Sequence, residues 1–219
     1  MLTFAEEILL LMLDDEDGTF LPTRTSAVEY VLAGAVLLDL AFANRIDTDE
    51  RQLLVIDSTP TGNPMLDRVL ERIAGSSGTR DTRAWIEKIT GEDTDEIRSQ
   101  ALASLVARGV LEARDEKFLW VFRSRRYPVI DGRVEREAKL RVTGVLLSDD
   151  IPDPRDVAMI GLVDACGILS EIFSGREIER AAPRIEQLRK MDLIGQEVGG
   201  AVAEIERSIM MAAVHAPHY

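Results

Sequence analysis

The chain has 219 residues, of which 46% are hydrophobic and 30% charged, the composition of a globular protein with a substantial core rather than of a disordered chain. Its 26 Lys and Arg against 39 Asp and Glu leave a net charge of -13, which argues against a general nucleic-acid binder because such proteins offer phosphates a broad basic face. The single cysteine, Cys166, excludes an intramolecular disulfide and favours a reducing compartment.

The first two predicted helices are strongly apolar. Thr3 and Glu6 have the spacing of a capping box, and the helix that they begin is broken by residues 14–18. Its apolar run has no basic leader, so we expect no signal peptide. The second helix begins near Ser26 and is apolar nearly all round, which predicts a buried central helix. No window approaches the roughly 20 continuous apolar residues that span a bilayer.

The middle of the chain is predicted to alternate hairpins and helices. Residues 45–57 favour a short β-hairpin, and Asn63 followed by Pro64 is typical of a helix start. The stretch "TRAWIEKITG" predicts a short helix that ends at Gly91, and the helix over 94–108 is expected to end at Gly109. "GVLEARDEKFLWVF" then predicts two short strands around an acidic turn.

Four further helices are predicted near residues 133–147, 154–173, 175–190 and 196–214, with prolines and glycines at their boundaries. The sequence contains no internal repeat, no low-complexity tract and no linker long enough to separate domains. We therefore predict a mainly α fold in which residues 1–219 form a single helical domain with short β-hairpins.

Residues suited to catalysis are few. His215 and His218 lie in the last five residues, and a frayed tail cannot hold a general base in place. Cys166 lies in an apolar helix, where a buried, inert thiol is expected. The "DDEDG" stretch at 14–18 lacks the ligand spacing of a calcium loop. The sequence therefore predicts no enzyme, no catalytic residue, no metal and no cofactor.

A basic island covers residues 117–141 of this acidic chain. It holds eight basic residues against three acidic ones, a net of +5, so that the rest of the chain carries -18. Arginines beside the apolar residues 127–130 would suit a membrane surface. Alternatively, the arginines pair with the acidic bulk and 127–130 cover the core. A winged helix is a third interpretation, although its recognition helix would begin with the acidic "GEDTDE".

Six stretches occur in the order seen in Golgi phosphoprotein 3-like proteins, which the chain resembles from about Leu2 to about Met211. They are "LTFAEEILLLMLDDEDG", "LAGAVLLDLA", "TPTGNPMLDRVL", "WIEKITG", "LVARGVLEA" and "DPRDVAMIGLVDACGILSEIF". The resemblance implies one mainly α-helical domain that attaches peripherally to membranes by recognising phosphatidylinositol 4-phosphate. Eukaryotic members are adaptors for Golgi glycosyltransferases and carry a disordered N-terminal arm. Because this chain begins at its first helix, we expect no such arm and a prokaryotic member.

The resemblance also implies a lipid-headgroup pocket, which this chain retains only in part. The family's arginine in the second helix corresponds to Ala33, and the arginine pair before "GVL" corresponds to Asp95 and Arg98. The family's tryptophan falls near Arg24, with Phe20 or Leu21 as the alternative occupant of its space. Arg98 and Arg24 are therefore the headgroup-binding candidates, and fewer guanidinium donors predict a weaker phosphate site.

The family's other membrane element is a hairpin with an apolar tip, which the resemblance places around residues 127–132. We expect it to contact the membrane through Arg123, Arg125, Arg126, Tyr127, Val129, Ile130 and Arg133. The predicted function is a peripheral protein on the cytosolic face of a membrane that binds anionic phospholipid, with phosphatidylinositol 4-phosphate implied by the resemblance. The alternative is a soluble interaction module that self-associates through the hairpin and has lost lipid binding. No protein client is predicted.

Overall fold

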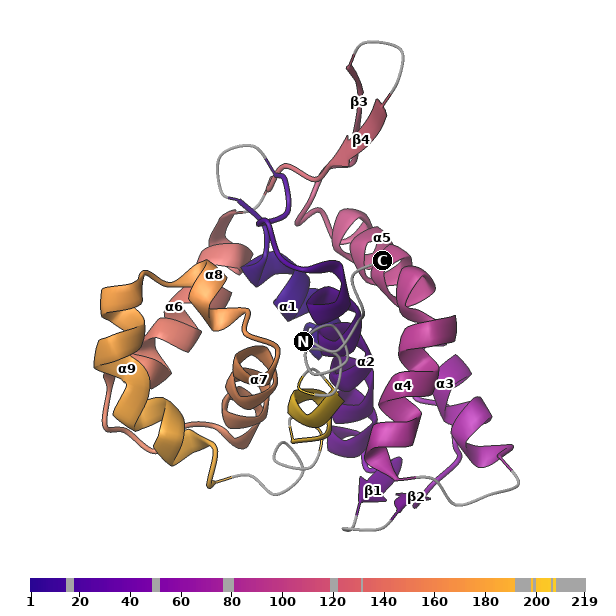
Figure 1. Ribbon diagram of the computed structural model, residues 1–219. Helices are drawn as coiled ribbons and strands as arrows, with labels where there is room; N and C mark the ends of the chain where they lie inside the picture. The colour runs from indigo at the N-terminus through magenta and orange to yellow at the C-terminus, as the bar shows by residue number, and fades with distance from the viewer. Residues whose placement is uncertain are drawn as a thin grey trace, which may run out of the picture.

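The structure, a computed structural model, describes residues 1–14, 18–48, 52–76, 81–118, 122–130, 132–191, 198, 200–205 and 207. Of residues 114–118 and 122–126 it describes the backbone alone. Helices dominate the fold, as predicted, and the strands form two small antiparallel pairs (Figure 1). The mainly α fold class is thus confirmed.

Helix α2, Thr25–Phe42, lies at the centre of the molecule. It contacts α1 (Phe4–Leu11), α3 (Pro64–Ala74), α4 (Thr82–Glu92), α5 (Thr94–Ala107) and α7 (Pro154–Ala165). By length and composition α2 could cross a bilayer, a property that the sequence analysis did not expect, but 67% of its residues are buried inside the protein. That burial is typical of a core helix, and the predicted buried central helix is confirmed.

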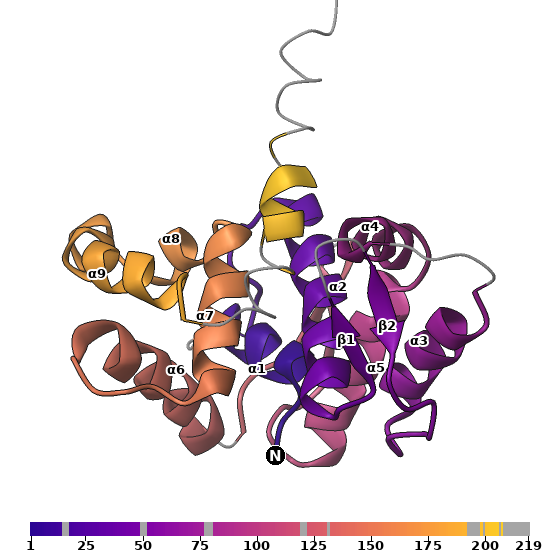
Figure 2. The same cartoon turned by 90° about the horizontal axis from the view of Figure 1, so that it is seen from below.

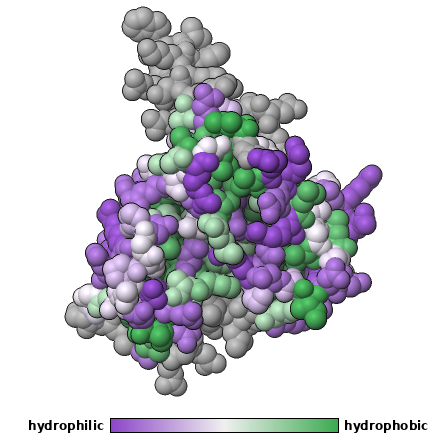
Figure 3. Space-filling model, turned by 180° about the vertical axis from the view of Figure 1, so that it is seen from behind, coloured by the Kyte–Doolittle hydropathy of each residue, from purple (hydrophilic) through white to green (hydrophobic). Residues whose placement is uncertain are grey.

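Seen from below, α2 has helices on both sides (Figure 2). One side carries α3, α4, α5 and the hairpin of β1 (Ile46–Thr48) with β2 (Leu53–Val55). The other carries α6 (Gly132–Leu147), α7, α8 (Leu169–Ile172) and α9 (Gly175–Leu188). Seen from behind, the surface intersperses hydrophobic and hydrophilic residues over these helices (Figure 3).

The helix ends follow their sequence signals in most places. The Thr3 hydroxyl accepts the Glu6 N–H at 3.1 Å, and the Thr3 N–H donates to the Glu6 carboxylate at 2.7 Å, so the predicted capping box is present. Asn63 accepts the Met65 N–H at 3.0 Å to begin α3. Gly109 follows α5 in the left-handed region at φ 69°, as expected of a residue that ends a helix.

Two helix boundaries differ from the prediction. Helix α4 continues through Gly91 to Glu92, because Gly91 keeps a helical backbone rather than a left-handed one. The helix predicted over 154–173 is divided into α7 and α8, since Gly167 has φ 71° and turns the chain. Of the helix predicted over 196–214, the described residues 198, 200–205 and 207 are helical.

The second hairpin differs from the prediction in its register. Strands β3 (Arg114–Phe118) and β4 (Phe122–Arg126) pair antiparallel, with Arg114 opposite Arg126 and Phe118 opposite Phe122. The predicted acidic turn is wrong, because Asp115 and Glu116 lie within β3 and Asp115 pairs with the oppositely charged Arg125. Residues 119–121, which join the strands, lie outside the described residues. The hairpin stands away from the helices (Figure 1).

Residues 127–130 form the base of this hairpin, and their prediction as its tip is wrong. The Tyr127 N–H donates to the Gly18 carbonyl at 3.0 Å, and the Ile130 N–H donates to the Val110 carbonyl at 2.9 Å. The register explains the error, since residues after β4 lie at the end of the strands opposite the turn. Tyr127 and Val129 are half-buried and pack against the core.

Candidate functional site

A cavity of about 140 Å³ opens where the loop after α1, the start of α2 and the start of α5 meet. This volume is small beside the ~300–1,000 Å³ of sites that enclose a drug-sized molecule. The apolar part of the wall comes from Met12, Phe20, Leu21, Val28 and Leu32, and the polar part from Thr23, Thr25, Glu29, Thr94, Asp95 and Arg98.

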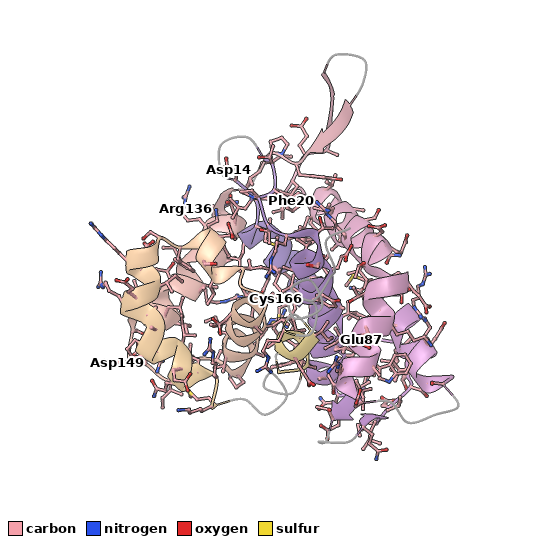
Figure 4. The ribbon with its side chains drawn as sticks, viewed as in Figure 1. Asp14, Phe20, Glu87, Arg136, Asp149 and Cys166 are labelled. Carbon is pink, nitrogen blue, oxygen red and sulfur yellow. The ribbon has the colours of Figure 1, made fainter. Side chains whose placement is uncertain are left out.

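Arg98 is the cation in this wall. Its guanidinium carbon lies 4.4 Å from the centre of the Phe20 ring, within the range of a cation–π contact. Within the described residues Arg98 forms no ion pair with a carboxylate. The Phe20 ring also meets Tyr127 edge to face, with ring centres 6.3 Å apart. The cavity is therefore joined through Phe20 to the base of the β3–β4 hairpin, below which Phe20 lies in Figure 4.

Two carboxylates share the wall with Arg98. Asp95 precedes Arg98 by one turn of α5, and Glu29 comes from the second turn of α2. The Thr23 hydroxyl oxygen is buried and has no hydrogen-bond partner in the described part of the chain. Among the described residues, the wall thus carries one cation, two anions and a hydroxyl without a partner, an arrangement suited to a small polar group of mixed charge.

The structure brings together only part of the predicted headgroup site. Arg24 is exposed at the N-cap of α2 and does not line the cavity. Phe20 and Leu21, the alternative occupants of the space of the family's tryptophan, do line the cavity. Ala33 is completely buried in the core and is not in the wall.

Four polar residues of the wall are not predicted from the sequence: Thr23, Thr25, Glu29 and Thr94. A signal for two of them was present in the periodicity of α2. Thr25, Glu29 and Leu32 recur at spacings of four and three, which places them on one face of the helix. That face is the one that the cavity exposes.

The hairpin carries most of the predicted membrane-contacting residues. Arg123, Arg125 and Arg126 lie on β4. Ile130 follows at the base of the hairpin with 61% of its surface exposed. Arg133 is exposed in the first turn of α6, and Arg136 follows it on the same helix (Figure 4). The hairpin strands and the start of α6 therefore form one basic region.

The last part of the basic island faces inward instead. The Arg141 guanidinium lies 2.6 Å from both the Glu7 and the Asp156 carboxylates, which are buried. Lys139 pairs with buried Glu135 at 2.8 Å. Burial raises the pKa of Glu7 and of Asp156, and the positive charge of Arg141 opposes that rise. This end of the island is structural.

A further buried carboxylate caps α1. The Phe4 N–H donates to both oxygens of Asp39, at 3.1 and 2.9 Å. The Arg155 guanidinium stacks 3.8 Å from the centre of the Phe4 ring and lies 3.7 Å from the Asp39 carboxylate. Burial raises the pKa of Asp39 to about 7, although the Phe4 N–H and Arg155 both act to lower it.

The described residues show no group of three or more His, Cys, Asp and Glu side chains placed to hold a metal ion. Cys166 is buried at the end of α7, near the middle of the molecule in Figure 4. The candidate binding residues of the described structure therefore lie in the cavity beside Arg98 and in the basic region.

Comparison with known proteins agrees with the resemblance seen in the sequence. The family model for Golgi phosphoprotein 3 (GPP34) matches residues 4–205. The chain is also similar to vacuolar protein sorting-associated protein 74 of Eremothecium gossypii, at 26% identity over 224 aligned residues that cover 85% of this chain and 67% of the relative. Because the family model covers nearly all of the chain, the protein belongs to the Golgi phosphoprotein 3 family.

Proposed function

We propose that this protein attaches peripherally to the cytosolic face of a membrane by binding anionic phospholipid, and that it does so without catalysis. The observation that carries the proposal is the β3–β4 hairpin, a basic element that projects from an acidic molecule (Figure 1). Its ten paired residues include five cations and two carboxylates, a net of +3, on a chain of net charge -13.

The strand register places cations at neighbouring positions. Arg114 pairs with Arg126, and Lys117 pairs with Arg123. Like charges opposite one another destabilise a strand pair, so an anionic surface that neutralises them would also stabilise the hairpin. Each basic residue near such a surface contributes on the order of 1 kcal/mol. Several such residues together therefore outweigh an exposed salt bridge, whose median contribution is roughly 0–1 kcal/mol.

Exposed Ile130, at the base of the hairpin, adds an apolar group beside the cations. Arg133 and Arg136 extend the basic region along α6. Apolar side chains among arginines suit the headgroup zone of a bilayer, where the aliphatic parts enter and the guanidinium groups stay with phosphates.

Family membership suggests phosphatidylinositol 4-phosphate as the headgroup. In this chain, however, Arg98 is the one cation among the described residues of the cavity wall, which also holds Glu29 and Asp95, and Arg24 lies outside it. A headgroup with two phosphates needs several guanidinium donors. We therefore take general negative charge, read by the hairpin, to be the main attraction.

Liposome co-sedimentation tests this proposal with three vesicle sets: neutral phosphatidylcholine, phosphatidylcholine with phosphatidylglycerol, and phosphatidylcholine with phosphatidylinositol 4-phosphate at equal total charge. We expect binding to both anionic sets with similar affinity and no binding to the neutral one. A strong preference for phosphatidylinositol 4-phosphate at matched charge would show instead that this chain retains a pocket specific for that headgroup. Absence of binding to either anionic set would refute membrane attachment.

The alternative function, self-association through the hairpin, makes a different prediction for the free protein. Light scattering after gel filtration would then give a mass above that of a 24.3 kDa chain. The double substitution Arg125→Ala and Arg126→Ala would lower this mass if the hairpin forms the contact. Under our proposal it leaves the mass unchanged and weakens vesicle binding.

A further inference from the structure

The negative charge in the cavity wall disfavours a ligand that carries only negative charge. Glu29 and Asp95 outnumber Arg98, and neither carboxylate forms an ion pair within the described residues. A carboxylate beside a phosphate site repels the phosphate, especially where solvent is partly excluded. Glu29 is half-buried and Asp95 is exposed, so both are open to a ligand that carries a positive group beside its phosphate.

From this arrangement we propose that the cavity binds a zwitterionic phosphoethanolamine headgroup, with its phosphate on Arg98 and its primary ammonium on Glu29 and Asp95. The inference rests on the proposed membrane attachment for the source of the headgroup, a lipid. It deepens that proposal by giving the two elements different roles. The hairpin would respond to the negative charge of the membrane surface, and the cavity would recognise one kind of lipid headgroup in that surface.

The phosphate end of this assignment follows from Arg98. Its guanidinium is held over the Phe20 ring at 4.4 Å and is not neutralised by a carboxylate among the described residues. The N–H groups of a guanidinium lie in its own plane, so a guanidinium placed over an aromatic ring can still donate to the oxygens of a phosphodiester. One guanidinium matches the single negative charge of that group.

The placement of the ammonium group follows from the hydrogen-bond acceptors in the cavity wall. A primary ammonium has three N–H donors, and the wall offers two carboxylates and the buried Thr23 oxygen, which lacks a partner in the described part of the protein. A quaternary ammonium has no N–H to donate and is bound by cages of aromatic faces. Phe20 is the aromatic residue of this wall, and Arg98 occupies one of its faces.

Size and position agree with a lipid headgroup. The volume of about 140 Å³ suits a small polar group rather than a whole lipid. Phe20 connects the cavity to Tyr127 at the base of the hairpin. A protein attached through that hairpin would therefore hold the cavity close to the headgroup layer, where the lipid's acyl chains remain in the membrane.

The test compares two vesicle sets with the same phosphatidylglycerol content, one made up with phosphatidylcholine and the other with phosphatidylethanolamine. We expect the protein to bind the second set about tenfold more tightly, the worth of one or two charge-assisted hydrogen bonds. The isosteric double substitution Glu29→Gln and Asp95→Asn removes both negative charges and is expected to remove the preference, while binding to the phosphatidylcholine set persists.

A matched control separates the cavity from net charge and from lipid packing. Asp149→Asn with Glu179→Gln makes the same charge change at exposed positions, and Figure 4 shows Asp149 far from Phe20. This control is expected to keep the preference for phosphatidylethanolamine. Equal binding of the unmodified protein to both sets would overturn the inference and leave membrane attachment standing. A preference that survives in the Glu29 and Asp95 variant would overturn it as well, because lipid packing would then be its cause.

An experiment with soluble compounds tests the specificity of the cavity if the protein binds no vesicle. Free O-phosphoethanolamine is added at millimolar concentration, and the melting temperature is compared with that in phosphocholine and in inorganic phosphate. A rise specific to O-phosphoethanolamine that the Glu29 and Asp95 variant lacks would support the cavity's specificity, with a soluble metabolite as its source. The same small effect from all three compounds would refute it.

Discussion

Arg98 lines the cavity but contributes little to holding the fold together. Its guanidinium rests on Phe20 at 4.4 Å and meets no carboxylate partner in the described chain. A contact of this kind at a partly exposed site is worth roughly 0.5–1 kcal/mol. Its contribution to folding is therefore small, and its value lies in presenting charge to the cavity.

The substitution Arg98→Gln is accordingly expected to change the free energy of unfolding by no more than about 1 kcal/mol. Because it removes the cation of the wall, it should abolish any response of the melting temperature to O-phosphoethanolamine. Urea denaturation and thermal shift measure the two effects. A loss of several kcal/mol in stability would show that Arg98 is structural and would contradict its role as a binding group.

Asp39 presents the opposite case, a charged group deep in the fold. It accepts the Phe4 N–H that begins α1 and lies 3.7 Å from Arg155, with Glu6 and Glu7 as its acidic neighbours. Burial is the largest influence and raises its pKa to about 7. The folded protein therefore binds this proton more tightly than the unfolded chain does, where the pKa is about 4.

The stabilising effect of that proton is present below about pH 4 and is lost as the pH rises through about 7. Relative to an Asp39→Asn variant, which cannot titrate, we expect the unmodified protein to lose on the order of 2–4 kcal/mol of stability between about pH 4 and pH 8. Urea denaturation of both proteins across this range gives the difference. A difference that stays flat with pH would contradict the raised pKa, and Asp149→Asn, at an exposed site, serves as the control.

At the scale of elements, the base of the β3–β4 hairpin depends on one glycine. Gly18 has φ 67°, and a Cβ there would lie 2.4 Å from the Pro128 nitrogen. The Gly18 carbonyl also accepts the Tyr127 N–H at 3.0 Å. Only glycine allows the loop after α1 to lie this close to the hairpin.

The substitution Gly18→Ala should destabilise this junction by about 2 kcal/mol or more, since the left-handed conformation alone costs an alanine roughly 1–2 kcal/mol. Hydrogen exchange should locate the damage at the Tyr127 amide. Gly144→Ala is the matched control, because Gly144 is helical and a Cβ there meets nothing within 4 Å. That control is expected to be neutral or stabilising by up to about 1 kcal/mol. Similar effects of the two substitutions would contradict the account of the junction.

The same junction marks the limit of prediction from sequence. Helix ends such as Thr3 with Glu6, and Asn63 with Pro64, were foreseen because the signals that set them are local. The hairpin register was not foreseen, since the stretch from 110 to 130 is β-prone throughout and its pairing is decided by distant contacts. The Gly18 carbonyl, more than 100 residues from Tyr127, is one such contact.

The residues of the cavity wall could likewise be predicted only in part. Arg98 and Phe20 were identified by family resemblance, and the structure places both in the wall. Arg24 was placed by counting along the loop, and counting cannot show which of Thr23, Arg24 and Thr25 turns inward. The structure turns the two threonines to the cavity and leaves the arginine exposed.

At the scale of the whole molecule, charge is divided between body and hairpin. Arg141 and Lys139 form ion pairs with buried carboxylates. The positive charge of this part of the basic island is therefore neutralised inside the fold. The hairpin, whose backbone projects from the helices (Figure 1), carries five basic residues, and Arg136 is exposed on α6 (Figure 4). Under the proposed function, an anionic membrane repels the acidic body and attracts the basic hairpin, so that the two together would orient the protein.

The most direct measurement of the central claim is the affinity of the Arg125→Ala and Arg126→Ala double variant for phosphatidylglycerol-containing vesicles. Removing two cations worth about 1 kcal/mol each at the surface predicts a loss of roughly 30-fold. The control, Arg176→Ala with Arg180→Ala, makes the same charge change at exposed positions of α9, away from the hairpin in Figure 1, and should lose only a few-fold. An equal loss in both variants, or no loss in either, would contradict the claim that the hairpin attaches this protein to membranes.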